Sequence, residues 1–278
     1  MVAIAVRDQA TTRIPPHFAL RDCRYGKMLF LARDRYIGRS LDLYGEYSEI
    51  EGRLFSRLLG NGQVVIEAGA NIGAHTIHLA RLVGPKGRVL AYEPQGVIFQ
   101  LLRANVALNK LRHVRSYHAA VGRRTGWIRV PLLDYAAEAN FGGVSLRAVA
   151  AGERVPMIAL DSLILRSLRL LKLDVEGMEI DALSGARRLI ARHRPLLYVE
   201  NDREENCQRL LRLIARLGYT PWWHLPPLFN PENYAGNRKN VFGRIVSANL
   251  LCVPEELPET IEDLRRIRDP AVTLRRCN

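Results

Sequence analysis

Short apolar runs alternate with amphipathic segments through most of the chain. Consecutive apolar residues are typical of strands buried on both faces, whereas apolar residues spaced three or four apart are typical of helices. We predict strands at residues 63–68, 88–92, 114–118, 170–174, 196–200, 219–223 and 249–253, and helices at 47–59, 74–83, 95–108, 178–191 and 204–217. This order indicates an α/β fold with a Rossmann-like, doubly wound, mostly parallel sheet of seven strands covered on both faces.

The other segments divide the chain into three parts. Residues 1–46 mix short apolar groups with charges and are predicted to form an N-terminal extension with short strands. Residues 47–254 form the α/β domain, and residues 255–278 form a C-terminal tail. Prolines and asparagines between residues 225 and 234 exclude regular structure, because proline has no N–H donor and a fixed φ. We therefore predict a lid loop at about 224–240.

Composition sets limits on the class of protein. With 278 residues, 48% of them hydrophobic, the chain can bury a full core, which excludes a disordered protein. No apolar run approaches the ~18 residues of a membrane span, and we expect a cytoplasmic protein. The four cysteines are scattered, without the spacing of a zinc site or a disulfide framework. The net charge of +13 suits either an acidic partner or a solvated basic surface.

The most informative segment lies at the end of the first predicted strand of the α/β domain. A glycine turn there brings backbone N–H groups toward a nucleotide-like ligand, and Glu67, just before it, attracts a cationic sulfonium and repels a pyrophosphate. A dinucleotide fingerprint would have glycine in place of Asn71, which disfavours a nicotinamide cofactor. The sequence thus predicts S-adenosylmethionine as the cofactor. The expected contacts are Glu67, Gly69, Ala70, Asn71, Gly73 and Thr76.

The next two strand ends complete the expected cofactor pocket. Glu93, followed by Pro94, lies twenty positions after Gly73, where an acidic residue can accept hydrogen bonds from both ribose hydroxyls. The following strand end, at residues 118–121, offers no carboxylate to the adenine amino group. Backbone groups or the loop that contains Asn140 are candidates for that contact.

Together these motifs resemble the FkbM family of S-adenosylmethionine-dependent methyltransferases. The resemblance spans about residues 47–254, and Glu67 stands where the family often has aspartate. It implies a class I methyltransferase fold and O-methylation of a hydroxyl on a sugar, a lipid-linked glycan or a polyketide-type natural product. The segments that carry it are residues 67–73 (EAGANIG), 92–94 (YEP), 140–143 (NFGG), 172–179 (KLDVEGME) and 195–201 (PLLYVEN).

Methyl transfer from a sulfonium to a hydroxyl requires alignment of the reacting atoms and a group that accepts the hydroxyl proton. Asp174, Glu176 and Glu200 at the fourth and fifth strand ends are the catalytic candidates, and Asp174 is also expected to face the cofactor. Side chains alternate along an extended segment, so Asp174 and Glu176 can face the same side. Either acid could instead cap the next helix. The predicted acceptor contacts are Asn140, Glu176, Glu200, Trp223 and Asn233.

Several alternatives stay open at this level. The carboxylates could hold Mg²⁺, although we expect no metal. A nucleic-acid methyltransferase would suit the positive charge, but the acids at 174 and 176 would repel a polyanion, and the Asn/Asp-Pro-Pro-aromatic segment of exocyclic-amine enzymes is missing there. A non-enzymatic S-adenosylmethionine-binding module is the third possibility. We expect a small-molecule or glycan acceptor, neutral or anionic, rather than nucleic acid.

Overall fold

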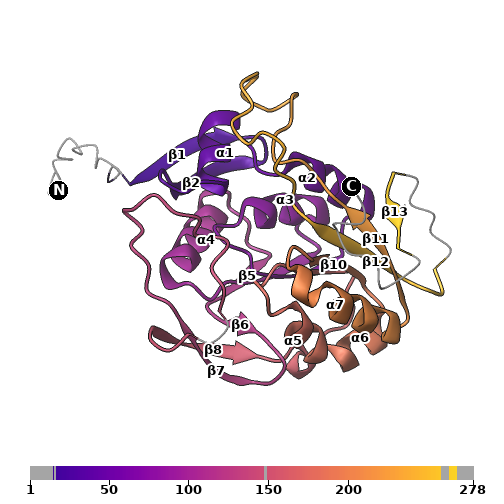
Figure 1. Ribbon diagram of the computed structural model, residues 1–278. Coiled ribbons are helices and arrows are strands. Elements are labelled where there is room, and N and C mark those ends of the chain that lie inside the picture. The colour runs from indigo at the N-terminus through magenta and orange to yellow at the C-terminus, as the bar shows by residue number, and fades with distance from the viewer. Residues whose placement is uncertain (1–14, 16, 147–148, 258–262, 268–278) are drawn as a thin grey trace, which may run out of the picture.

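The computed structural model describes residues 15, 17–146, 149–257 and 263–267. Its centre is an eight-stranded mixed sheet with the strand order β13-β11-β12-β10-β9-β3-β4-β5 (Figure 1). The strands are β3 (Val64–Ala68), β4 (Arg88–Tyr92), β5 (Val114–Tyr117), β9 (Leu170–Leu173), β10 (Leu196–Glu200), β11 (Tyr219–His224), β12 (Asn249–Pro254) and β13 (Arg265–Arg266). The five strands from β10 to β5 are parallel, and the other three are antiparallel. The prediction of seven mostly parallel strands is therefore wrong in strand number, because β13 from the C-terminal segment pairs with the edge of β11.

Helices cover both faces of the sheet, as predicted. One face packs against α2 (Glu49–Leu58), α3 (Ala74–Val83) and α4 (Gly96–Leu108), and the other against α5 (Glu179–Ser184), α6 (Arg187–His193) and α7 (Glu204–Arg216). The single helix expected at 178–191 is in fact two, because α5 ends at Gly185 and α6 begins after Ala186.

The two faces follow the alternation of side chains along the strands. Val65 packs under α2 and α3, while its neighbour Ile66 belongs to the cluster on the opposite face. Glu67 shares the face of Val65, and the register places Lys172 of β9 beside Glu67 and Tyr198 of β10 beside Lys172. Three polar side chains therefore lie in a row beneath the α2 and α3 layer.

The N-terminal extension forms a hairpin of β1 (Phe18–Cys23) and β2 (Gly26–Leu31), followed by helix α1 (Ile37–Tyr44). Asn105 of α4 holds this hairpin: its side chain accepts a hydrogen bond from the N–H of Leu29 and donates one to the Leu29 carbonyl. Short strands were expected in this extension, and β1 and β2 lie within residues 18–31; residues 1–14 and 16 lie outside the described part of the chain.

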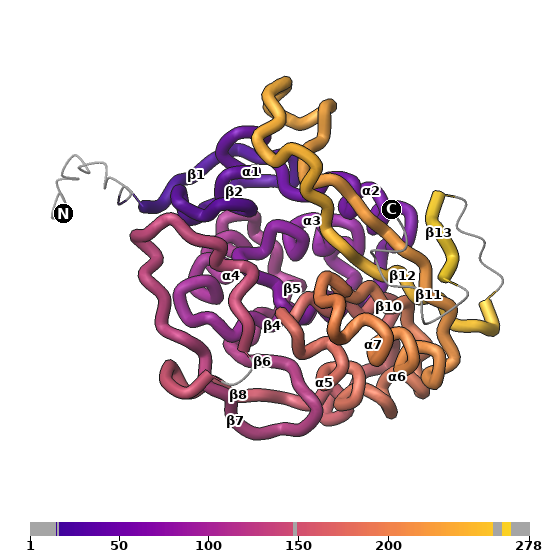
Figure 2. Tube along the Cα trace, viewed as in Figure 1, coloured from indigo at the N-terminus to yellow at the C-terminus, as the bar shows by residue number. Residues whose placement is uncertain are grey.

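The segment predicted as a lid packs against this extension (Figure 2). Phe229 and Phe242 contact Tyr44 of α1, and Asn230 donates a hydrogen bond to Glu46 over 2.9 Å. The loop is irregular, as its prolines predict. These contacts anchor it to α1.

A smaller sheet lies at one edge of the molecule, beside α5 (Figure 1). It contains β6 (Ala120–Val121), β8 (Glu153–Ile158) and β7 (Gly126–Val130), and a short 3₁₀ helix, η1 (Leu160–Ser162), leads from it toward β9. Among the described residues, no helix is both long and apolar enough to cross a bilayer. The predicted tail after residue 255 lies partly outside the described ranges.

Candidate active site

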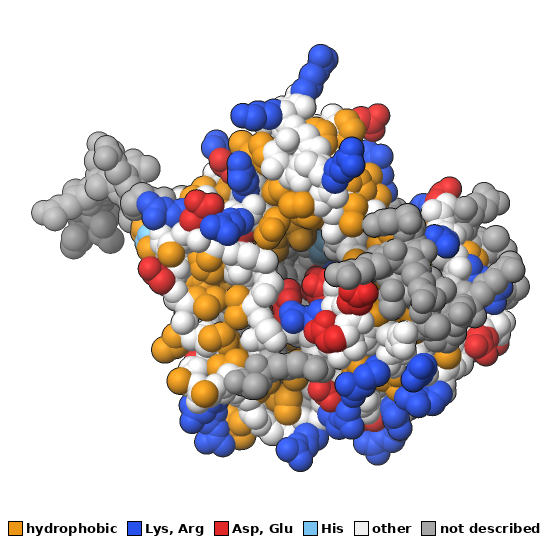
Figure 3. Space-filling view, in the orientation of Figure 1, with side chains coloured by type: hydrophobic (Ala, Val, Ile, Leu, Met, Phe, Trp, Pro, Cys, Tyr) orange, Lys and Arg blue, Asp and Glu red, His pale blue; other side chains and the backbone are white. Residues whose placement is uncertain are grey.

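A cleft of about 280 Å³ opens at the carboxyl ends of the parallel strands, where ligands bind in doubly wound sheets. Figure 3 shows acidic side chains gathered around this hollow. Its polar wall is strongly acidic although the chain carries a net charge of +13. The acidic side chains that line it are Glu51, Glu67, Glu93, Asp174, Glu176, Glu200 and Asp202, and the lysine and arginine are Lys172 and Arg203.

The glycine turn after β3 forms one wall of the cleft. The N–H groups of Gly69 and Ala70 both donate to the carbonyl of Tyr92, which ties the turn to the end of β4. Gly69 has φ +79°, and a Cβ there would lie 1.7 Å from the backbone oxygen of Asp174. Position 69 therefore requires glycine because the backbone at the end of β9 lies against it. The sequence suggested only that a ligand approaches this glycine closely.

Glu93 is fixed beside this turn. Its two carboxylate oxygens accept hydrogen bonds from the backbone N–H groups of Asn71 and Gln95, over 2.9 and 2.8 Å. Burial raises the pKa of Glu93 to about 7, despite these two bonds. Each oxygen has a further lone pair, so this carboxylate can still accept hydrogen bonds from a ligand in the cleft.

Glu67 lies deeper, on the face of the sheet that α3 covers. It accepts a 2.6 Å hydrogen bond from the hydroxyl of Thr76, and burial raises its pKa to about 7. Thr76 itself is fully buried behind Glu67, and Gly73 also stands outside the cleft lining. The structure thus brings Glu67, but neither Gly73 nor Thr76, to the predicted cofactor site.

Lys172 is a cleft residue that reasoning from the sequence missed. It is 2% exposed and forms a 3.1 Å ion pair with Asp174, and the charges of Asp174, Glu67 and Glu51 raise its pKa although burial opposes this. Burial also raises the pKa of Glu51 and lowers that of His75, whose Nε2 lies 3.5 Å from Glu51. The sequence did contain a signal for this residue, because Lys172 is a charged residue within the apolar run of the strand at 170–173.

Glu51 was missed for a different reason. It follows Ser48 by three positions at the start of α2, which is the pattern of a helix capping box. The structure does not form this box: Ser48 makes no side-chain bond to the backbone of α2 and instead donates a 2.7 Å hydrogen bond to the Glu51 carboxylate. The long-range contact with Tyr198 of β10, which also hydrogen-bonds His224 over 2.7 Å, has no local sequence signal.

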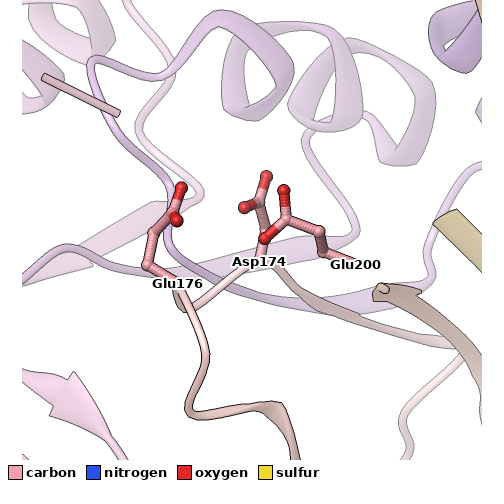
Figure 4. Close-up of side chains that lie close together, drawn as sticks. All are labelled: Asp174, Glu176 and Glu200. Carbon is pink, nitrogen blue, oxygen red and sulfur yellow. The ribbon is translucent and has the colours of Figure 1, made fainter. Parts of the chain in front are cut away.

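The three predicted catalytic carboxylates converge (Figure 4). One oxygen from each of Asp174, Glu176 and Glu200 lies within 4.8 Å of the others. The chain reaches this arrangement through a left-handed turn, with φ +53° at Glu176 and +93° at Gly177, rather than through the extended segment expected from the sequence.

The three acids differ in their partners. Lys172 contacts Oδ2 of Asp174, and Arg203 contacts Oε2 of Glu176 over 3.0 Å. Oε2 of Glu200 is buried and has no hydrogen-bond partner among the described residues. Burial, followed by the charge of Asp174, raises the pKa of Glu176 to about 8 and that of Glu200 well above its usual value.

The predicted acceptor residues divide into two groups. Asn140 lines the cleft with Glu176 and Glu200, and its side chain accepts a hydrogen bond from the N–H of Gly143. Trp223 is 3% exposed and packs in the core, and Asn233 is buried in its own loop, where it donates to the carbonyls at 230 and 237. Neither of these two side chains reaches the cleft, because β11 turns Trp223 inward and the loop folds onto α1.

A parallel α/β sheet with a glycine turn and buried acids at adjacent strand ends defines a Rossmann-like, cofactor-binding enzyme. Residues 67–221 match the model of the methyltransferase FkbM domain, and the chain belongs to this family. The family is one of S-adenosylmethionine-dependent methyltransferases. Among curated proteins, no sequence matches the chain.

Several solved structures are similar to this chain at low sequence identity. A methyltransferase FkbM from Methylobacillus flagellatus KT is 20% identical, with a TM-score of 0.45, over 73% of this chain and 50% of its own length. Cofactor-bound Rv0187 from MTB is 16% identical, with a TM-score of 0.45, over 75% of this chain and 81% of its own. TYW2 from M. jannaschii, solved with AdoMet, is 14% identical, with a TM-score of 0.44, over 86% of both chains. This chain spans half the length of the Methylobacillus protein.

The residues of the cleft fit S-adenosylmethionine. Glu93 offers a rigid, buried carboxylate for hydroxyl donors, and the excess of acids favours a ligand that carries a sulfonium. Ala120, Val121 and Leu146 form an apolar part of the wall that can accept a purine face.

Proposed function

We propose that this chain transfers the methyl group of S-adenosylmethionine to a hydroxyl of a sugar, a glycan or a polyketide-type natural product. The observation that carries this proposal is the group of three carboxylates beside the cofactor cleft, in which a buried oxygen of Glu200 has no hydrogen-bond partner in the described part of the chain. A hydroxyl acceptor needs a group that takes its proton, and an unpartnered carboxylate oxygen can do so.

The proposal assigns the cofactor contacts to the glycine turn and the next strand end. Glu93 accepts the ribose hydroxyls, and residues 69–71 with Pro94 pack against the adenosine and the sulfonium side. When bound, S-adenosylmethionine supplies an electrophilic methyl group. Glu67, behind the turn, adds negative charge on that side of the cleft.

Glu200 is the proposed general base. Asp174 and Glu176 each form an ion pair, with Lys172 and Arg203 respectively, whereas the buried Oε2 of Glu200 has no partner among the described residues. As the hydroxyl attacks, its O–H bond breaks and Glu200 takes the proton. The oxygen forms the bond to the methyl carbon, and the C–S electron pair remains on sulfur.

The acidic wall also bears on the class of acceptor. Seven acids line the cleft beside only two strongly basic side chains, and this arrangement disfavours a polyanion such as nucleic acid. Sugar and polyketide hydroxyls are neutral and can enter without this cost. We therefore propose a neutral group at the reacting end of the acceptor.

The test is transfer of a labelled methyl group from S-adenosylmethionine to panels of glycans and polyketide-type hydroxyl compounds, with mass spectrometry to place the new O-methyl ether. We expect E200Q to reduce kcat at least a hundredfold with little change in cofactor affinity, and E232Q, an exposed acid that is 80% accessible, to leave both unchanged. Cofactor binding without transfer to any panel would favour a non-enzymatic binding module. Labelling of RNA or DNA, or of an amine, would overturn the proposal.

A further inference from the structure

Asp174, Glu176 and Glu200 lie close enough together to bind one cation. Their oxygens lie within 4.8 Å of one another. Divalent cations bind oxygen at about 2.0–2.6 Å, so two ligands on opposite sides of one ion are roughly 4–5 Å apart. Side chains in this arrangement can reach a single ion with small rotations.

A second observation points to a ligand at the centre of this group. Oε2 of Glu200 is buried and has no hydrogen-bond partner among the described side chains and backbone groups, and its side chain points toward Asp174 (Figure 4). Leaving a buried carboxylate oxygen without a partner is costly, so such an atom usually marks a proton, an ordered water or an ion.

The cations of the protein do not satisfy this oxygen. Lys172 contacts Asp174 at Oδ2, and Arg203 contacts Glu176 at Oε2. Two positive side chains face seven acids in the cleft wall, and a bound sulfonium adds one more positive charge. Acidic side chains therefore outnumber the cationic groups in the cleft, and neither Lys172 nor Arg203 contacts Oε2 of Glu200.

We propose that Asp174, Glu176 and Glu200 bind one divalent cation, of the Mg²⁺ or Mn²⁺ class, through one oxygen each. Hard cations of this class prefer carboxylate oxygens and keep several water ligands, which an acceptor hydroxyl can replace. When bound, the cation would lower the pKa of a coordinated acceptor hydroxyl. This role for the cation rests on the proposed O-methylation, whereas the binding site itself does not. The expectation of no metal is replaced by this proposal.

The test is Mn²⁺ binding to the chelator-treated chain of 278 residues, measured as the loss of the electron paramagnetic resonance signal of free Mn²⁺. We expect one site per chain, competition by Mg²⁺, and at least tenfold weaker binding in E200Q and in E176Q. E232Q serves as the matched control and retains the affinity of the unaltered protein. Circular dichroism and the affinity for S-adenosylhomocysteine report whether each variant is folded.

The outcomes separate this inference from the proposed function. One Mn²⁺ per chain, lost in the folded E200Q or E176Q variants, supports the site even if the acceptor is not a hydroxyl. No saturable Mn²⁺ binding up to 1 mM (an order-of-magnitude limit for weak protein sites), or equal binding in all variants, overturns it. O-methylation at full rate in the presence of EDTA, together with absent Mn²⁺ binding, would leave the proposed function intact and remove the cation.

Discussion

Replacing Lys172 with methionine tests how much this buried cation stabilises the folded protein through its interactions with the neighbouring acids. Methionine has a similar length and fills the same space, so the change removes a charge and leaves no large cavity. The Nζ of Lys172 lies 3.1 Å from Asp174, which corresponds to about 5 kcal/mol of attraction at an effective dielectric constant of ~20. Removing one member of a buried pair typically costs 3–5 kcal/mol.

Partial exposure of Asp174 reduces this value. Its side chain is 38% accessible, so water compensates part of the lost attraction, and we expect K172M to lower the free energy of unfolding by about 3 kcal/mol at pH 8. At roughly 2–4 °C per kcal/mol for a chain of this size, the melting temperature falls by about 6–12 °C. K27M is the matched control, because Lys27 forms a 2.6 Å pair with Asp22 in which both side chains are more than half exposed. It should lower the free energy by less than about 1 kcal/mol.

The pH dependence provides the decisive comparison. Lys172 stays charged between pH 6 and 8, since its pKa is raised. Without it, the pKa values of Glu67 and Glu51 rise further above those of the unfolded chain, because Lys172 lowers both. Stability from an acid with a raised pKa is present at low pH and is lost as the pH rises through that value. The loss in K172M should therefore be smaller at pH 6 than at pH 8, measured by thermal and urea denaturation. An equal loss at both pH values, or a loss no greater than that in K27M, would refute this electrostatic account.

Two further predictions concern the cofactor wall. G69A should abolish cofactor binding or unfold the protein, because a Cβ at this position would lie 1.7 Å from the carbonyl oxygen of Asp174. G62A is the control: Gly62 has φ +85° and no neighbour within 4 Å, so this change should lower the free energy of unfolding by only about 1 kcal/mol. Calorimetry of cofactor binding and melting curves of the two variants check this. The affinity for S-adenosylhomocysteine should rise from pH 6 to pH 8, because Glu93, with a pKa of about 7, accepts ribose hydroxyls best when ionised. E93Q should bind about tenfold more weakly and with a smaller pH slope. An unchanged slope in E93Q would assign the titration to another group.

The sequence predicts the sheet and helices of the α/β domain because their apolar periodicity is local. The predicted strands at 88–92 and 196–200 and the predicted helix at 74–83 agree with the structure in both bounds. The helix expected at 178–191 is interrupted because Gly185 packs against the carbonyl of Gly122, a contact from a distant part of the chain. Strand β13 pairs through two arginines and has no apolar pattern to reveal it.

The candidate site shows the same division between local and distant contacts. Glu93 follows a strand at motif spacing, so its position at the cleft could be inferred from the sequence alone. Lys172 and Glu51 meet only because the strand register and the packing of α2 bring them to one face of the sheet. Trp223 shows the opposite error: it was predicted to contact the acceptor because it lies next to the predicted lid, but strand alternation directs its side chain into the core.

The net charge of the chain is positive, whereas most ionisable side chains that line the cleft are acidic. Most of the arginines are exposed on helices and loops, where the field of each charge is screened within about 8–10 Å at moderate ionic strength. Glu51, Glu67 and Glu93 of the cleft are buried, as is Lys172, and the interactions among these groups are screened much less. A chain with a basic surface can therefore contain an acidic cleft, and we expect the cleft, rather than the surface, to select the acceptor. We expect the charges that line the cleft to influence methyl transfer more than the exposed charges of the surface do.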